Sequence, residues 1–155
     1  MASVSLTIAG GDKLAAKLAQ IAGKLGSGGT LAVGFLEGAT YPSKPDGDSI
    51  NVASVAFFNE FGTTRAPPRP FFRRMIAAKS PQWGKLLATA AKKHDYDFVQ
   101  TLNTMGSIIQ GELVDSINAF TTPALAPSTV KRKGFSTPLV DTSKMVNSVD
   151  YEIKP

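Results

Sequence analysis

The sequence contains no cysteine and a single histidine, His94. The lack of cysteine excludes disulfides, thiolate nucleophiles and zinc sites of the Cys type. Any Ser-His-Asp chemistry has to use His94 or be absent. The chain has no pattern typical of a signal peptide, and nowhere do ~18 apolar residues run together as a membrane span requires. We therefore expect a soluble protein without a membrane partner, made in the cytosol.

Acidic residues are also missing from one long stretch, between Glu60 and Asp95. The same stretch holds eight basic residues, namely Arg65, Arg69, Arg73, Arg74, Lys79, Lys85, Lys92 and Lys93. The net charge of +5 is therefore unevenly placed, with a basic block at residues 65–93. Such a block suits phosphate or an acidic protein surface, and it is equally typical of a solvated helical face.

With 155 residues the chain is expected to form a single domain, residues 1–155. Alternating apolar residues predict strands at residues 4–8, 31–35 and 149–153, and apolar residues at helical spacing predict a helix from Asp12 to Leu25. Polar, Pro- and Gly-marked residues predict a protruding loop near 37–50. A helix follows from Asn51, and we expect Gly62 to end it in the left-handed conformation.

The clearest periodicity predicts an amphipathic helix from Tyr96 to Ala119. Gly106 and Gly111 inside it each cost up to ~1 kcal/mol relative to alanine, which indicates that another backbone packs close by. Before it, a helix is expected to begin at Pro70 and to yield to another near Pro81. The predicted fold class is α+β, with a small antiparallel sheet packed with several helices, including this long amphipathic one.

Motifs that carry chemistry are weak throughout the chain. Ser128 and Lys131 have the S-x-x-K spacing, but the companion S-D-N and K-T-G elements are absent, and Ser128 is better interpreted as the cap of a short helix. Residues 46–51 begin like a calcium loop, yet Phe57 stands where the bidentate glutamate is required. We predict no catalytic set, no cofactor and no metal site, so that the protein is not an enzyme.

The most unusual feature of the sequence is a dense cluster of phenylalanines. Five phenylalanines lie within sixteen residues, namely Phe57, Phe58, Phe61, Phe71 and Phe72. One helix cannot bury the first three on a narrow stripe, so either part of this surface faces another element or chain, or all five fill one core. Asn59 and Glu60 are expected to satisfy backbone donors or to pair with Arg69.

This stretch resembles the "NEFGT … PARPF" signature of the neck or tail-completion proteins of long-tailed bacteriophages. A second stretch resembles the "PSTIKRKG … PLIDTG" segment of the same family, and residues 145–151 resemble its closing "L-x-x-S-I-x-Y". The matched residues fall in 56–73, 126–134 and 138–142. Ser143 departs from the pattern because the family has glycine there, so Thr142 is expected to cap a helix that has Ser143 in its first turn.

The resemblance implies a structural virion protein that forms a homo-oligomeric ring at the head-tail junction, six copies being our guess. The ring would join the head-tail connector to the tail terminator or tail tube, around a channel through which DNA passes without sequence-specific binding. The expected locations are the virion neck or tail and, during assembly, the host cytoplasm. The candidate interface or structural residues are Asn59, Glu60, Phe61, Gly62, Arg69, Pro70, Phe71, Phe72, Arg73, Lys131, Arg132, Lys133, Asp141 and Thr142.

Two other functions stay open at this point. The basic block favours a DNA-binding module outside the virion, whose affinity falls steeply with salt. A small hydrolase would depend on Ser128 and Lys131 alone.

Overall fold

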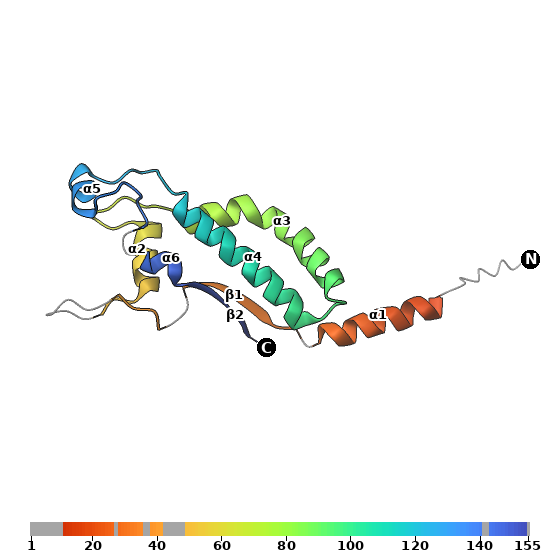
Figure 1. Ribbon diagram of the computed structural model, residues 1–155. Coiled ribbons are helices and arrows are strands. Elements are labelled where there is room, and N and C mark those ends of the chain that lie inside the picture. Colours follow the sequence, from red (N-terminus) through yellow and green to blue (C-terminus); the bar gives the residue numbers. More distant parts are fainter. Residues whose placement is uncertain (1–10, 27, 36–37, 42–48, 141–142, 155) are drawn as a thin grey trace, which may run out of the picture.

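A computed structural model describes residues 11–26, 28–35, 38–41, 49–140 and 143–154. The elements in chain order are α1 (Gly11–Leu25), β1 (Thr30–Phe35), α2 (Val52–Phe61), α3 (Phe71–Lys93), α4 (Phe98–Asn118), α5 (Pro127–Lys133), α6 (Lys144–Asn147) and β2 (Val149–Lys154). The chain combines several helices with a small antiparallel sheet, and α3 and α4 lie to one side of that sheet, which confirms the α+β class (Figure 1). The strand expected at residues 4–8 and most of the loop expected near 37–50 lie outside the described residues.

The sheet of the described chain is a single antiparallel pair, β1 with β2, in which Val33 lies opposite Tyr151. It lies against α4, where the Nε2 of Gln110 donates to the Val149 carbonyl at 2.8 Å. Gly106 faces the Tyr151 ring and Gly111 faces open space. The expected close packing is thus real at Gly106, although against a side chain rather than a backbone, and it is wrong at Gly111.

Helix α3 runs unbroken through Pro81, so the break expected there is wrong. A proline inside a helix removes one backbone hydrogen bond and clashes with the preceding turn, which bends the helix; α3 is visibly bent in Figure 1. Anchors to α4 lie on both sides of the proline. Ser116 Oγ donates to the Phe71 carbonyl at 2.8 Å, and Trp83 Nε1 donates to Glu112 Oε2 at 2.8 Å. These contacts keep both halves of α3 against α4.

At the starts of α2 and α4 the side chain of the N-cap residue itself accepts a backbone hydrogen bond. Asn51 Oδ1 accepts the Ala53 N–H at 2.7 Å at the start of α2, and Asp97 Oδ1 accepts the Gln100 N–H at 2.8 Å at the start of α4. Gly62, which ends α2, has φ 79° and ψ 177°. Its φ is positive as expected, but the conformation is extended in ψ and is therefore not the left-handed helical one.

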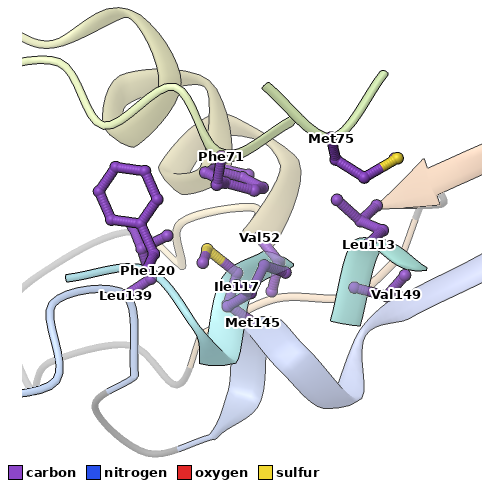
Figure 2. Close-up of a cluster of buried hydrophobic side chains, with 10 residues drawn as sticks. Val52, Phe71, Met75, Leu113, Ile117, Phe120, Leu139, Met145 and Val149 are labelled. Atoms are coloured by element: carbon purple, nitrogen blue, oxygen red, sulfur yellow. The ribbon is translucent and has the colours of Figure 1, made fainter. Parts of the chain in front are cut away.

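The hydrophobic core lies where α2, the beginning of α3, the end of α4, α6 and the beginning of β2 meet (Figure 2). Its buried members are Val52, Ala56, Phe71, Met75, Leu113, Ile117, Phe120, Leu139, Met145 and Val149. This core fixes α2 against α3, and it leaves the two remaining sides of α2 available for other contacts. Among the described residues, no helix is long and apolar enough to cross a membrane.

Candidate interaction surfaces on α2

The junction of α2 with α3 is built around the carboxylate of Glu60, which is 5% exposed. Its oxygens accept the backbone N–H of Phe72 at 2.9 Å and that of Arg73 at 3.2 Å. Arg73 also donates its Nε to Glu60 Oε1 at 2.7 Å and a terminal nitrogen to the Glu60 carbonyl at 3.1 Å. Glu60 thus caps α3 from another helix, where a carboxylate also suits the positive helix end.

Glu60 satisfies backbone donors, as one of the sequence alternatives predicted, but it does not pair with Arg69. Asn59 uses its side chain locally, donating Nδ2 to the Val55 carbonyl at 2.9 Å. Arg69 hydrogen-bonds to α2 through its backbone N–H, which donates to the Asn59 carbonyl at 2.7 Å. No hydrogen bond joins the Arg69 guanidinium to a described residue of α2.

The proline-containing segment 63–70 turns back tightly between α2 and α3. Thr63 and Ala66 form a bridge, with the Thr63 N–H donating to the Ala66 carbonyl at 2.9 Å. A Cβ on Gly62 would lie 2.8 Å from the Pro68 nitrogen, so the close approach and the positive φ both require glycine. Pro70 is the N-cap residue of α3, which confirms the expected helix start within one residue.

Three phenylalanines of α2 form an exposed surface, here called the aromatic face: Phe57 is 57%, Phe58 52% and Phe61 52% exposed. Their rings contact one another, with centroids 4.6 Å apart for Phe57 and Phe61 and 6.2 Å apart for Phe57 and Phe58. Phe71 is buried in the core and Phe72 is half-buried. The five phenylalanines therefore do not fill one core.

A small hollow of about 160 Å³ opens beside the aromatic face. It is lined almost entirely by apolar side chains, including those of Phe35, Phe57, Phe61 and Phe72. The Arg73 guanidinium lies 4.8 Å from the Phe61 ring centroid and covers one side of that ring. This edge of α2 therefore presents an open, mostly apolar surface.

A larger pocket of about 370 Å³, here called the Arg69 pocket, lies on the other side of α2. It brings the two resembling motifs together, because Asn59 and Arg69 from the first face Arg132 and Lys133 from the second. The rest of the lining is mostly apolar: Tyr41, Ile50, Val55, Leu125, Thr129, Pro138, Leu139 and Met145. Glu60, Phe61 and Phe72 line the hollow on the opposite side instead.

The three consecutive basic residues of α5 have different surroundings. Lys131 and Arg132 are exposed, whereas the Lys133 ammonium donates to the Thr137 carbonyl at 2.9 Å and to the Val140 carbonyl. Asp141 and Thr142 lie outside the described residues. Ser143 is the N-cap residue of α6 with φ 57°, so the expectation that it lies in the first turn of the helix is wrong. The serine adopts the positive φ for which the resembling family has glycine.

Helix α1 carries the predicted amphipathic stripe, here called the α1 stripe: Leu14, Leu18, Ile21 and Leu25. None of its residues is buried, and Leu14 and Leu18 are 61% and 57% exposed. In Figure 1 the helix points away from the other elements, at the end of the molecule opposite α2. The spacing of the leucines was visible in the sequence, but it did not reveal that the described part of the chain leaves them unburied.

An ion pair between Lys24 and Asp95 ties the end of α1 to the turn between α3 and α4. The Lys24 ammonium lowers the pKa of Asp95 below its ordinary value of 3.8, through its hydrogen bond and its charge. Asp95 and Tyr96 in this turn have positive φ of 49° and 63°. Tyr96 therefore belongs to the turn between the helices. Helix α4 begins at Phe98, two residues after the predicted start.

The residues weighed for chemistry are separate in the structure. His94 ends α3 with its Nε2 2.8 Å from Thr104 Oγ1. Ser128 is exposed and does not cap α5, since Ala126 is the N-cap residue and Pro127 the first helical one. Within the described parts of the chain, no three His, Asp or Glu side chains are grouped as a metal site requires.

A scan against protein-family models finds no match for this chain, and searches of curated proteins and of solved structures find none either.

Proposed function

We propose that the protein is a structural virion component that assembles into a ring at the phage head-tail junction, joining the connector to the tail around the DNA channel. The resemblance of residues 56–73 and 126–142 to neck proteins supports the biological setting. The exposed aromatic face of α2 is the observation that carries the proposal of self-assembly. In the channel, tight phosphate binding would hinder DNA that has to slide.

The aromatic face is costly to leave in water. Burying a phenylalanine is worth roughly 1.5–3 kcal/mol, so three rings that are each about half exposed retain on the order of 3 kcal/mol of unused hydrophobic stabilisation. Single exposed apolar residues are ordinary, but a contiguous exposed cluster marks an interaction site. A second chain is therefore the expected cover for Phe57, Phe58 and Phe61.

The α1 stripe supplies a different apolar surface at the other end of the molecule (Figure 1). Two different surfaces on one chain are what a head-to-tail contact needs, and such a contact closes into a ring when the rotation between copies permits. In this arrangement the α1 stripe of one copy covers the aromatic face of the next. Leucines at helical spacing suit the hollow beside Phe57 and Phe61.

The test is the mass of the purified protein by light scattering across a concentration range, with electron microscopy of the same fractions. We expect rings for the wild-type chain, and mostly monomers for Phe58→Glu and for Leu18→Glu. Ala19→Glu and Gln82→Glu add the same charge at exposed positions outside the two surfaces and should still form rings.

A mixing experiment distinguishes the head-to-tail contact from a symmetric one. Phe58→Glu keeps the α1 stripe and Leu18→Glu keeps the aromatic face, so the mixture should form a dimer that neither variant forms alone. A wild-type chain that stays monomeric at every concentration contradicts self-assembly. Ring formation by both Phe58→Glu and Leu18→Glu would contradict the proposed contact between the α1 stripe and the aromatic face.

The DNA-binding alternative has less support, because several arginines of the basic block are buried or already contact other side chains of the protein. Arg69 is buried, Arg73 is paired with Glu60, and the Arg74 guanidinium lies 5.7 Å from the Phe120 ring centroid. The exposed lysines of α3 remain for phosphate contact, namely Lys79, Lys85, Lys92 and Lys93. Duplex DNA binding that weakens steeply with salt, and that is lost in Lys85→Glu/Lys92→Glu, would favour this alternative.

A further inference from the structure

The Arg69 pocket holds a buried cation, and the described residues that line it include no counter-charge. Arg69 is 9% exposed, and its Nε is buried without any hydrogen-bond partner. No hydrogen bond or ion pair joins its guanidinium to a residue of the described chain. Because an arginine side chain stays charged in proteins, burial cannot be relieved by losing the proton.

The rest of the lining indicates which kind of group the pocket suits. Among the described residues that line the pocket there is no carboxylate, whereas Arg132 and Lys133 add two further cations on the α5 side. Lys133 already donates to the carbonyls of Thr137 and Val140, so Arg69 is the cation expected to bind the ligand. A buried charge without a partner is strongly unfavourable, and it becomes tolerable when an opposite charge with good hydrogen-bond geometry enters.

We propose that the Arg69 pocket binds a carboxylate group that another molecule carries next to an apolar group. A guanidinium matches a carboxylate through parallel hydrogen bonds, and Nε is one of the donors used in that geometry. Apolar side chains such as Val55, Leu139 and Met145 then cover the carbon chain to which the carboxylate is attached. The proposal does not depend on ring assembly.

The same lining disfavours phosphate as the ligand. A nucleic-acid phosphate lies on a bulky, hydrated backbone and is bound mainly at open basic surfaces. The Arg69 pocket has a volume of about 370 Å³ and a mostly apolar wall, which fits a small acidic side chain or acid. A glutamate or aspartate side chain of a partner protein has the required chemistry.

The probe is pentanoate, compared with inorganic phosphate and with pentanol, on the full chain. The readout is the NMR signal of the Arg69 Nε–H, assigned by its loss in Arg69→Gln, together with the thermal unfolding midpoint. We expect millimolar pentanoate to shift the Arg69 signal and raise the midpoint, with phosphate at least about tenfold weaker and pentanol inactive. Arg69→Lys keeps the charge without the fork and should bind more weakly.

Removal of Arg69 also removes a buried side chain, so a second variant tests the pocket without it. Thr129 lines the wall, and Thr129→Glu supplies a carboxylate from within the chain. This variant should unfold at higher temperature than Thr129→Gln and should no longer respond to pentanoate. The proposal is overturned if pentanoate leaves the Arg69 signal unchanged, or if Thr129→Glu is no more stable than Thr129→Gln.

A carboxylate of the same chain, such as that of Asp141, is the alternative source, and Asp141→Asn tests it. If the ligand comes from another molecule, this variant binds pentanoate with unchanged affinity. A gain of about tenfold or more in affinity would assign the pocket to Asp141 and overturn the proposal.

Discussion

Gly106 of α4 and Tyr151 of β2 pack so closely that no side chain fits between them. A Cβ placed on Gly106 would lie 2.7 Å from the Cγ of the Tyr151 ring. The ring is held there by its hydroxyl, which lies 3.2 Å from Asn103 Oδ1 and 3.4 Å from Ser107 Oγ. At this point helix and sheet approach each other to a distance that only glycine permits.

Gly106→Ala is predicted to destabilise the protein by about 1–3 kcal/mol, because the added methyl group overpacks a contact whose ring carbons cannot move away cheaply. Gly111→Ala, in the same helix and in open space, is predicted to stabilise it by about 0.5–1 kcal/mol. Urea unfolding measures both changes. Equal effects of the two substitutions, or no relief of the Gly106→Ala cost in a Tyr151→Ala background, would contradict this account of the contact.

Glu60→Ala is predicted to cost about 2–3 kcal/mol, because it leaves the first N–H groups of α3 without their buried acceptor. Arg73→Met removes the other member of the ion pair but leaves those backbone bonds intact. Since the Arg73 side chain is 55% exposed, its ion pair is solvent-screened and its loss should cost about 1 kcal/mol or less. Chemical denaturation of the two variants separates the roles, and an equal cost would show that the ion pair rather than the cap is what matters.

The partner of Glu60 could not be predicted from the sequence. Arg69 and Arg73 are both close to Glu60 along the chain, and charge alone does not choose between them. The choice is made by the start of α3 at Phe71, which directs the Phe72 and Arg73 N–H groups toward Glu60. That start depends on how the proline-containing segment turns back, which is a property of tertiary structure.

The elements themselves were more predictable, because periodic apolar residues and capping residues act locally. The α1 stripe, the helical pattern from Asn51 and the β2 alternation each produced the predicted element. Pro81 misled the prediction because its local preference is overridden by the contacts of Trp83 and Phe71 with α4. The Arg69 pocket was not predictable, since it joins segments about sixty residues apart.

Ser143→Gly is predicted to stabilise the protein by about 0.5–1 kcal/mol. Ser143 has φ 57° and makes no capping hydrogen bond through its side chain, so it bears the strain of the left-handed conformation without compensation. Ser148→Gly is the matched control. Ser148 has φ −100° and its Oγ donates to the Lys144 carbonyl at 2.7 Å, so glycine there should destabilise. The prediction fails if thermal unfolding shows Ser143→Gly to be less stable than wild type.

The Lys24–Asp95 pair makes the attachment of α1 dependent on pH. The pKa of Asp95 is lowered in the folded protein, so the pair contributes stability above the unfolded value of 3.8 and loses it as the pH falls through the lowered pKa. Lys24→Met should therefore raise the pKa of Asp95 toward 3.8. Lys17→Met should raise it less, because Lys17 acts only through its more weakly felt charge.

Carboxyl NMR titration of Asp95 in the wild type and in both variants measures these shifts directly. His94 and Asp97 line another pocket together with Lys24 and Asp95. Because these two titratable groups lie near Asp95, their titrations have to be followed in the same experiment. Lys13→Met, on the first turn of α1, is the control and should leave the Asp95 titration unchanged. If Lys24→Met left the pKa of Asp95 as low as in the wild type, the ion pair would not be what holds the end of α1 against the α3–α4 turn.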